Sequence, residues 1–188
     1  MSSQPTAAGL PDADLFGSDH FALFGLPRSF VLDERALESR YHELQSAVHP
    51  DRHAYRAEQD KRLSMQWATR VNEAYRLLRA PLTRARYLLE LLGVDVGAEN
   101  NTAMPADFLM QQMEWREALD EARGARDAAA LDALERALRQ ARRDAEALLV
   151  QQLDTEPDTG AAAATVRRMM FIARLGEDIA EAHEILEN

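Results

Sequence analysis

The most distinctive chemistry in this chain lies in four consecutive residues: His49, Pro50, Asp51 and Arg52. Proline has no N–H and biases the residue before it away from helical geometry, so a helix preceding this stretch should end near Val48 or His49. The imidazole, the proline ring and the carboxylate are then presented together on a turn.

A metal site is the first alternative for this stretch, because His49 and His53 are separated by four positions. Pro50 breaks the helix that would align the two imidazoles, and no carboxylate or cysteine completes a ligand set. The chain contains no cysteine at all, which excludes disulfides and a thiol nucleophile. No glycine-rich loop suited to holding phosphates occurs either. We therefore expect no metal, no cofactor and no enzymatic activity.

Two amphipathic helices should position the turn. Apolar residues recur at helical spacing on both sides of it: Leu37, Tyr41, Leu44 and Val48 before, and Leu63, Trp67, Val71, Ala74 and Leu78 after. Helices joined by a loop of this kind fold back antiparallel, which would bury Tyr41 and Leu44 against Trp67 and Val71. The turn is then left exposed at the tip of the hairpin. Either Ser29 or Asp33 is expected to cap its first helix.

A second apolar pattern occupies the helix predicted over residues 108–122. At about 100° per residue, one narrow sector holds a core stripe: Phe108, Trp115, Leu119 and Ala122. A separate sector holds Leu109, Met110 and Met113, together with Glu114, Glu117 and Glu121. A helix of a three-helix bundle buries only one stripe, so the second sector predicts an exposed apolar patch with a carboxylate rim, a common partner site. Alternatively, Leu109 and Met110 pack beneath the N-terminal unit and fix the two domains together.

Turn-forming residues divide the chain into four parts: a flexible tail (1–18), the hairpin unit with a following helix (19–93), a linker (94–104) and a helical bundle (105–188). Pro81 should interrupt the long helix before it, and Gly93 should end the next one. Three helices are expected in the last part, over 105–122, 127–153 and 158–186, separated by breaks at Gly124 and at 154–160. The predicted fold class is all-α.

Charge is distributed unevenly over a chain of net charge −10. Residues 19–80 hold 10 basic and 9 acidic side chains, whereas residues 105–188 hold 10 and 18, which suggests two surfaces with two kinds of partner. Nucleic acid is not expected as a partner, because phosphate contacts need clustered cations.

The first 18 residues lack the basic or apolar character of a targeting signal, and no stretch is apolar enough to span a membrane. The prediction is a bacterial cytoplasmic protein without a membrane partner.

The sequence His49-Pro50-Asp51 between two such helices resembles the HPD signature of J domains, which bind and stimulate heat-shock-class ATPases. Residues 21–27 and 71–78 resemble the first and third helices of that domain. The segment Phe108-Leu109-Met110, followed by Met113 and Glu114, resembles the scaffold-binding segment of the HscB family of J-protein co-chaperones in iron–sulfur cluster assembly. The likeness extends from residue 19 over nearly the whole chain, including residues 165–168. It implies an N-terminal J domain, an antiparallel helical hairpin with an HPD loop, followed by a C-terminal three-helix bundle.

The resemblance also implies two partners, the HscA chaperone and the IscU scaffold protein. The implied chaperone-binding residues are His49, Pro50, Asp51, Arg40 and Arg52, with Asp51 offering its carboxylate to a chaperone cation. The implied scaffold-binding residues are Leu109, Met110, Met113, Glu114, Glu117, Glu121 and Phe171. Phe171 falls near the predicted core stripe of its helix, so a core aromatic is an equal alternative. A different client for the acidic bundle is the alternative function.

The helix before the HPD sequence departs from the J-domain pattern. Many J domains carry a strongly basic second helix that steers an acidic chaperone surface. Here Glu38 and Glu43 dilute the charge of Arg35 and Arg40. Electrostatic steering should therefore be weaker, and Arg52 should supply more of it.

Overall fold

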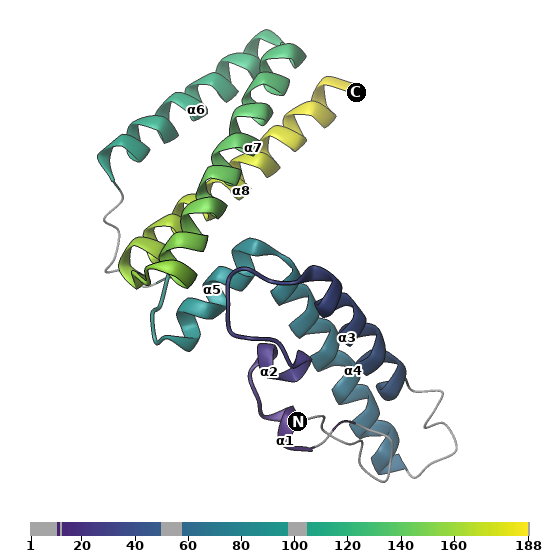
Figure 1. Cartoon of the computed structure of the whole chain (residues 1–188). Coiled ribbons are helices and arrows are strands. Elements are labelled where there is room, and N and C mark those ends of the chain that lie inside the picture. The colour runs from purple at the N-terminus through teal and green to yellow at the C-terminus, as the bar shows by residue number, and fades with distance from the viewer. Residues whose placement is uncertain (1–10, 12, 50–57, 98–104, 188) are drawn as a thin grey trace. The chain divides into compact units, whose positions relative to one another are not determined.

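A computed structural model of the chain describes residues 11, 13–49, 58–97 and 105–187. Over these residues the protein is built from helices and contains no strand, which confirms the predicted all-α class. The backbone divides into two compact units, residues 1–84 and 85–188. Figure 1 shows the helices of each unit with their labels.

The first unit is organised around a helical hairpin. Its helices are α1 (Ala13–Phe16), α2 (His20–Phe24), α3 (Glu34–Val48) and α4 (Glu58–Arg79). Helices α3 and α4 lie side by side, and α2 packs against both (Figure 1). Aspartates begin two of these helices, because a side-chain oxygen at the N-cap satisfies backbone N–H groups that have no partner within the helix. Asp19 accepts from the Ala22 N–H at 3.0 Å, and Asp33 accepts from the N–H groups of Arg35 and Ala36.

The hairpin is antiparallel, as predicted, since the end of α3 meets the beginning of α4. The Ser64 hydroxyl donates to the Val48 carbonyl at 2.7 Å, and the Tyr41 hydroxyl donates to the Asn72 side chain at 2.9 Å. Ser64 is fully buried whereas Leu63 is exposed, so the predicted stripe of α4 is wrong at its first position. The serine can occupy the interior because its one hydroxyl is satisfied by a carbonyl that the end of α3 leaves unpaired.

Apolar side chains on the facing stripes of the hairpin form its core. Those buried are Leu37, Leu44, Val48, Trp67, Val71, Ala74 and Leu78. Tyr41 is only half-buried, because its ring stacks on Tyr75 at a centroid distance of 4.0 Å, near the edge of the interface. Tyr41 is therefore less buried than predicted, and it contacts Asn72 and Tyr75 of α4.

Part of the predicted tail is structured. Residues 13–16 form α1, and the Phe16 ring meets Trp67 edge to face at 4.9 Å. The Arg70 guanidinium lies 5.5 Å from the centre of the Phe16 ring, and it also donates to the Ser18 carbonyl. The prediction of a flexible segment is thus wrong for residues 13–18, because one aromatic side chain finds a surface on α4. Residues 1–10 and 12 lie outside the described residues.

The second unit contains most of α5 (Pro81–Leu91) and a three-helix bundle. The bundle consists of α6 (Ala106–Ala125), α7 (Ala128–Val150) with the π-helical turn η2 (Gln151–Thr155), and α8 (Thr159–Glu187). Figure 1 shows α6, α7 and α8 alongside one another. Their shared core includes Phe108, Trp115, Leu119, Leu131, Leu138, Ile172, Leu175 and Ile179.

Helix ends follow the sequence in most places. Helix α4 stops at Arg79 before Pro81, and Gly93 adopts a φ of 76° after α5. The break predicted at Gly124 is wrong, because α6 continues to Ala125 and Arg126 takes the left-handed position with a φ of 53°. Backbone bonds that close the helix hold Arg126 there: its N–H donates to Arg123, and that of Asp127 donates to Ala122 at 2.9 Å.

Candidate functional site

The end of α3 carries the first predicted site. The helix stops at Val48, and His49 follows as its exposed C-cap with an extended backbone. This agrees with the expected stop before Pro50. His49, His42, Gln45 and Ser46 line a shallow cavity of about 300 Å³ along the last turns of α3. Pro50, Asp51 and Arg52 lie outside the described residues, so their predicted roles stay predictions.

Arg40, the remaining residue predicted to bind the chaperone, projects from the middle of α3. Its side chain is about half exposed (47%), and one guanidinium nitrogen lies 2.5 Å from a Glu43 carboxylate oxygen. Its Nε also donates to the Phe24 carbonyl at 3.4 Å. An exposed ion pair of this kind is weak. It nevertheless offsets much of the Arg40 charge in the free protein, as the presence of Glu43 in the sequence suggested.

Helix α6 carries the second predicted site, and it has two distinct apolar faces. Phe108, Trp115, Leu119 and Ala122 are buried in the bundle core, whereas Leu109, Met110 and Met113 are 47%, 61% and 63% exposed. Glu114, Glu117 and Glu121 are exposed as well. We call Leu109, Met110 and Met113 with these three glutamates the α6 patch. Its exposure confirms the division of the helix into two stripes that the sequence indicated.

Phe171 of α8 is half-buried and belongs to an aromatic cluster with α6. Its ring centre lies 5.8 Å from that of Phe108 and 6.4 Å from that of Trp115. The Arg116 guanidinium lies 5.5 Å from the centre of the same ring. Phe171 therefore packs on the core, which agrees with the alternative prediction of a core aromatic, while part of its ring stays accessible. Its role in scaffold binding stays a prediction.

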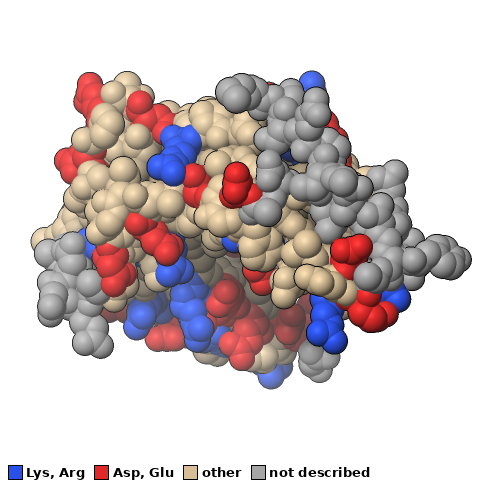
Figure 2. Space-filling model, turned by 90° about the horizontal axis from the view of Figure 1, so that it is seen from below, with Lys and Arg blue, Asp and Glu red and all other residues tan. Residues whose placement is uncertain are grey.

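Electrostatics over the described residues are those of a mixed surface. Figure 2 shows one face of the molecule, where Lys and Arg side chains lie among Asp and Glu side chains. Two ion pairs lie along α7: Arg139 with Glu135 at 3.3 Å, and Arg142 with Glu146 at 2.8 Å. Surface pairs of this kind add little stability.

Among the described carboxyl groups, that of Asp19 has a shifted pKa. Burial alone would raise the pKa of Asp19, but hydrogen bonds from the Ala22 N–H and the Arg28 side chain outweigh it and lower this pKa. Arg28 approaches the carboxylate to 2.7 Å. Asp19 therefore stays charged in the folded protein and keeps α2 capped.

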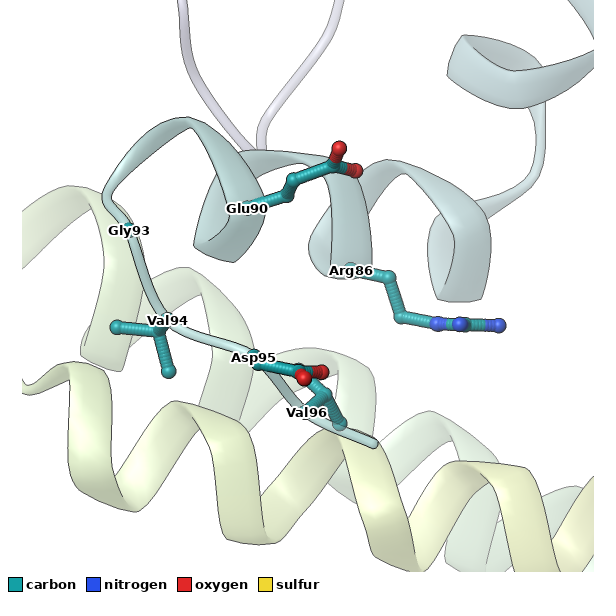
Figure 3. Close-up of a pocket in the computed structure, with 6 residues that line it drawn as sticks. All are labelled: Arg86, Glu90, Gly93, Val94, Asp95 and Val96. Atoms are coloured by element: carbon teal, nitrogen blue, oxygen red, sulfur yellow. The ribbon is translucent and has the colours of Figure 1, made fainter. Parts of the chain in front are cut away.

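Two further groupings were not singled out from the sequence. Arg86, Glu90 and Asp95 contribute to a pocket of about 310 Å³ after α5, and Figure 3 shows the first two extending from the helix and the third from the segment after Gly93. Asp132 and Glu135 of α7 lie near His183 of α8, and the carboxylate oxygens and the imidazole nitrogen that could bind a metal ion lie within 4.8 Å of one another. His183 Nε2 lies 3.6 Å from Asp132, so the pair is an ion pair between helices when the imidazole is protonated.

A helical hairpin followed by a bundle with an exposed apolar stripe defines an all-helical protein of two units. Within the described residues, no helix is long and apolar enough to cross a membrane. A family model described as the HSCB C-terminal oligomerisation domain matches residues 104–180.

Curated relatives extend this match to most of the chain. A co-chaperone protein HscB homolog of Azoarcus sp. (strain BH72) is 56% identical over 170 residues, which cover 90% of this chain and 96% of the relative. A homolog of Burkholderia mallei (strain SAVP1) is 56% identical with the same coverage. The chain therefore belongs to the HscB family of co-chaperones.

Solved structures agree with this assignment. Chaperone HscB from Vibrio cholerae is 36% identical with a TM-score of 0.77, over 90% of this chain and 99% of that one. Human co-chaperone protein HscB is 31% identical with a TM-score of 0.81, over 91% of this chain and 83% of that one. The J domain and the C-terminal helical domain predicted from the sequence are thus confirmed as the fold.

Proposed function

We propose that this protein is an adaptor in iron–sulfur protein maturation in the bacterial cytoplasm. Its bundle binds the IscU scaffold protein, and its HPD loop engages the HscA chaperone and stimulates HscA ATPase activity. The observation that carries the proposal is the α6 patch, an exposed apolar surface on a member of a co-chaperone family. Patches of this kind on soluble proteins mark partner sites.

Scaffold binding would use the apolar part of the patch for affinity and its carboxylates for specificity. Methionine suits such a surface because its flexible thioether side chain adapts to the shape of a partner. Glu114, Glu117 and Glu121 at the rim favour a scaffold surface with basic side chains, since complementary charges raise the association rate and exclude wrong partners. Phe171 would extend the contact surface from α6 to α8.

Chaperone binding would depend on Asp51. Its carboxylate accepts a charge-assisted hydrogen bond from a cation of the chaperone, while His49 and Pro50 fix the turn and complete the contact. Removing the carboxylate would leave the chaperone cation unpaired in the interface, which costs more than the loss of a neutral hydrogen bond. Arg52, with a smaller contribution from Arg40, would steer the encounter.

The adaptor role requires no chemistry in this chain. A protein that holds IscU and HscA at once raises the effective concentration of the scaffold at the chaperone. Stimulated ATP hydrolysis would then trap the scaffold on the chaperone and promote cluster transfer. The other candidate function, a co-chaperone for a different client, shares the HPD mechanism and differs only in what the α6 patch binds.

Isothermal titration of IscU into this protein and two variants tests the proposal. Met110→Glu places a charge in the apolar patch and should abolish measurable binding. Met65→Glu on α4 is the matched control, because Met65 is 54% exposed and lies in the other unit. Absence of binding to the unmodified protein would favour the different client, and equal losses in both variants would rule out the α6 patch as the site.

A further inference from the structure

The apolar side chains of the α6 patch lie on the first turns of a helix that begins without a side-chain cap. Pro105 occupies the N-cap position and offers no side-chain hydrogen bond. Only its carbonyl closes the first turn, accepting from the N–H groups of Phe108 and Leu109 at 3.0 and 3.1 Å. Uncapped helix ends fray, because their first N–H groups have no partner within the helix. Leu109 and Met110 therefore need another anchor to keep a fixed geometry.

Arg168 of α8 supplies that anchor through two contacts with these turns of α6. Its guanidinium lies 4.8 Å from the centre of the Phe108 ring, a cation–π distance. One of its terminal nitrogens donates to the Gln111 side-chain oxygen at 2.9 Å. Phe108 and Gln111 are three positions apart and bracket Leu109 and Met110. The contacts of Arg168 thus hold the stretch of backbone that carries the two apolar side chains.

The same side chain connects the two parts of the predicted scaffold surface. Arg168 precedes Phe171 by three positions, so the two share one face of α8. Phe108 contacts both, since its ring lies edge to face with that of Phe171. No carboxylate of the described residues pairs with Arg168, and its Nε is buried without a hydrogen bond. Its contribution is therefore the stack on Phe108 and the bond to a neutral amide.

From this geometry we propose that Arg168 is a positioning residue for scaffold binding. It holds the first turns of α6 against α8, so that Leu109, Met110 and Phe171 form one prearranged surface. This inference rests on the proposed function, because it assumes that the surface binds IscU. Without the anchor, the first turns of α6 open locally, and the apparent affinity falls in proportion to the fraction of molecules that remain competent to bind.

The test uses the full chain and three substitutions: Arg168→Met, Gln111→Ala and the two combined. Methionine keeps an apolar stem of similar length but removes both contacts. Arg142→Met is the matched control, because Arg142 is an exposed arginine on α7 that pairs with Glu146. Amide hydrogen exchange of residues 107–112 in the free protein and the affinity for IscU are measured for each variant.

Loss of both contacts should speed exchange in residues 107–112 by more than about tenfold for Arg168→Met. IscU binding should weaken by a smaller factor, about threefold or more, because affinity falls only as far as the open form becomes populated. Gln111→Ala should act in the same direction with a smaller effect. The double variant should match Arg168→Met alone, because the two residues act through one contact. Exchange in α7 and the affinity of Arg142→Met should stay within about twofold of the unmodified protein.

Unchanged exchange and affinity in Arg168→Met would overturn the inference, as would an equal loss in Arg142→Met, which would indicate a general charge effect. If Arg168→Met fails to fold, Gln111→Ala still decides between these outcomes, because it removes only the hydrogen bond to Arg168. Failure of the unmodified protein to bind IscU would refute the proposed function instead, while the exchange rates would still show whether Arg168 holds the helix.

Discussion

Helices α4 and α6 are close in length, with 22 and 20 residues, but they use their apolar side chains differently. In α4 the main apolar stripe is buried in the hairpin, and the two exposed apolar residues, Leu63 and Met65, are two positions apart and so face different directions. In α6 one stripe is buried, while Leu109, Met110 and Met113 gather on a second face. A single helix can therefore stabilise its own unit and still offer a binding surface.

The difference indicates how each unit would contact its partner. The hairpin buries most of its apolar side chains in its own core, which leaves charged side chains and the predicted HPD turn for the proposed contact with the chaperone. The bundle leaves the apolar side chains of the α6 patch exposed, and a partner protein could bury them in an interface.

Asp51→Asn should abolish stimulation of HscA ATPase activity. Asparagine keeps the size of the side chain but removes the charge that a chaperone cation needs. Glu177→Gln is the control, because Glu177 is an exposed carboxylate of α8, outside the first unit, and lies 3.9 Å from Arg174. Steady-state ATPase rates provide the measurement, and circular dichroism should show the same melting temperature for both variants. Retained stimulation by Asp51→Asn would contradict the role assigned to the hairpin tip.

Replacing Leu109, Met110 and Met113 together by alanine should weaken IscU binding by more than about 2 kcal/mol, since apolar anchors at the centre of an interface dominate affinity. Because all three are exposed, each change should alter the free energy of unfolding by no more than about 0.5 kcal/mol. Titration calorimetry and urea unfolding separate the two effects. A large loss of stability would favour the alternative in which Leu109 and Met110 fix the two domains together.

Gly124→Ala should stabilise the bundle by about 0.5–1 kcal/mol, because glycine inside a helix costs that much relative to alanine. A Cβ at this position would meet no atom within 4 Å. Urea unfolding followed by the fluorescence of Trp115, in a Trp67→Phe background, measures the bundle separately. If the variant is instead less stable, Gly124 rather than Arg126 ends α6.

Acid should weaken the first unit through Asp19, with the smallest of these effects. Since the folded protein lowers the pKa of Asp19, its stabilising contribution is complete above the ordinary aspartate pKa and is lost as the pH falls through the lower, folded value. Asp19→Asn should therefore show a shallower fall in melting temperature between about pH 5 and about pH 2. Melting curves followed by Trp67 fluorescence, in a Trp115→Phe background, provide the measurement, and parallel curves would contradict it.

Periodicity and turn chemistry in the sequence predicted the hairpin, the bundle and the two faces of α6, because these depend on local spacing. Details that depend on distant partners were missed. Ser64 is buried only because the Val48 carbonyl lies opposite, and α1 forms where Phe16 finds Trp67. The anchor at Arg168 likewise needs Phe108 and Gln111 from another helix. Positions of this kind become visible only once the helices are packed.

If this one chain couples a scaffold to a chaperone, the coupling should appear in the ATPase activity of HscA. Rates are measured with this protein alone, with IscU alone and with both. The adaptor account predicts that the two together stimulate hydrolysis by more than the sum of their separate effects, and that the triple alanine variant of α6 removes the excess. Purely additive rates, or an excess that survives the triple substitution, would contradict it.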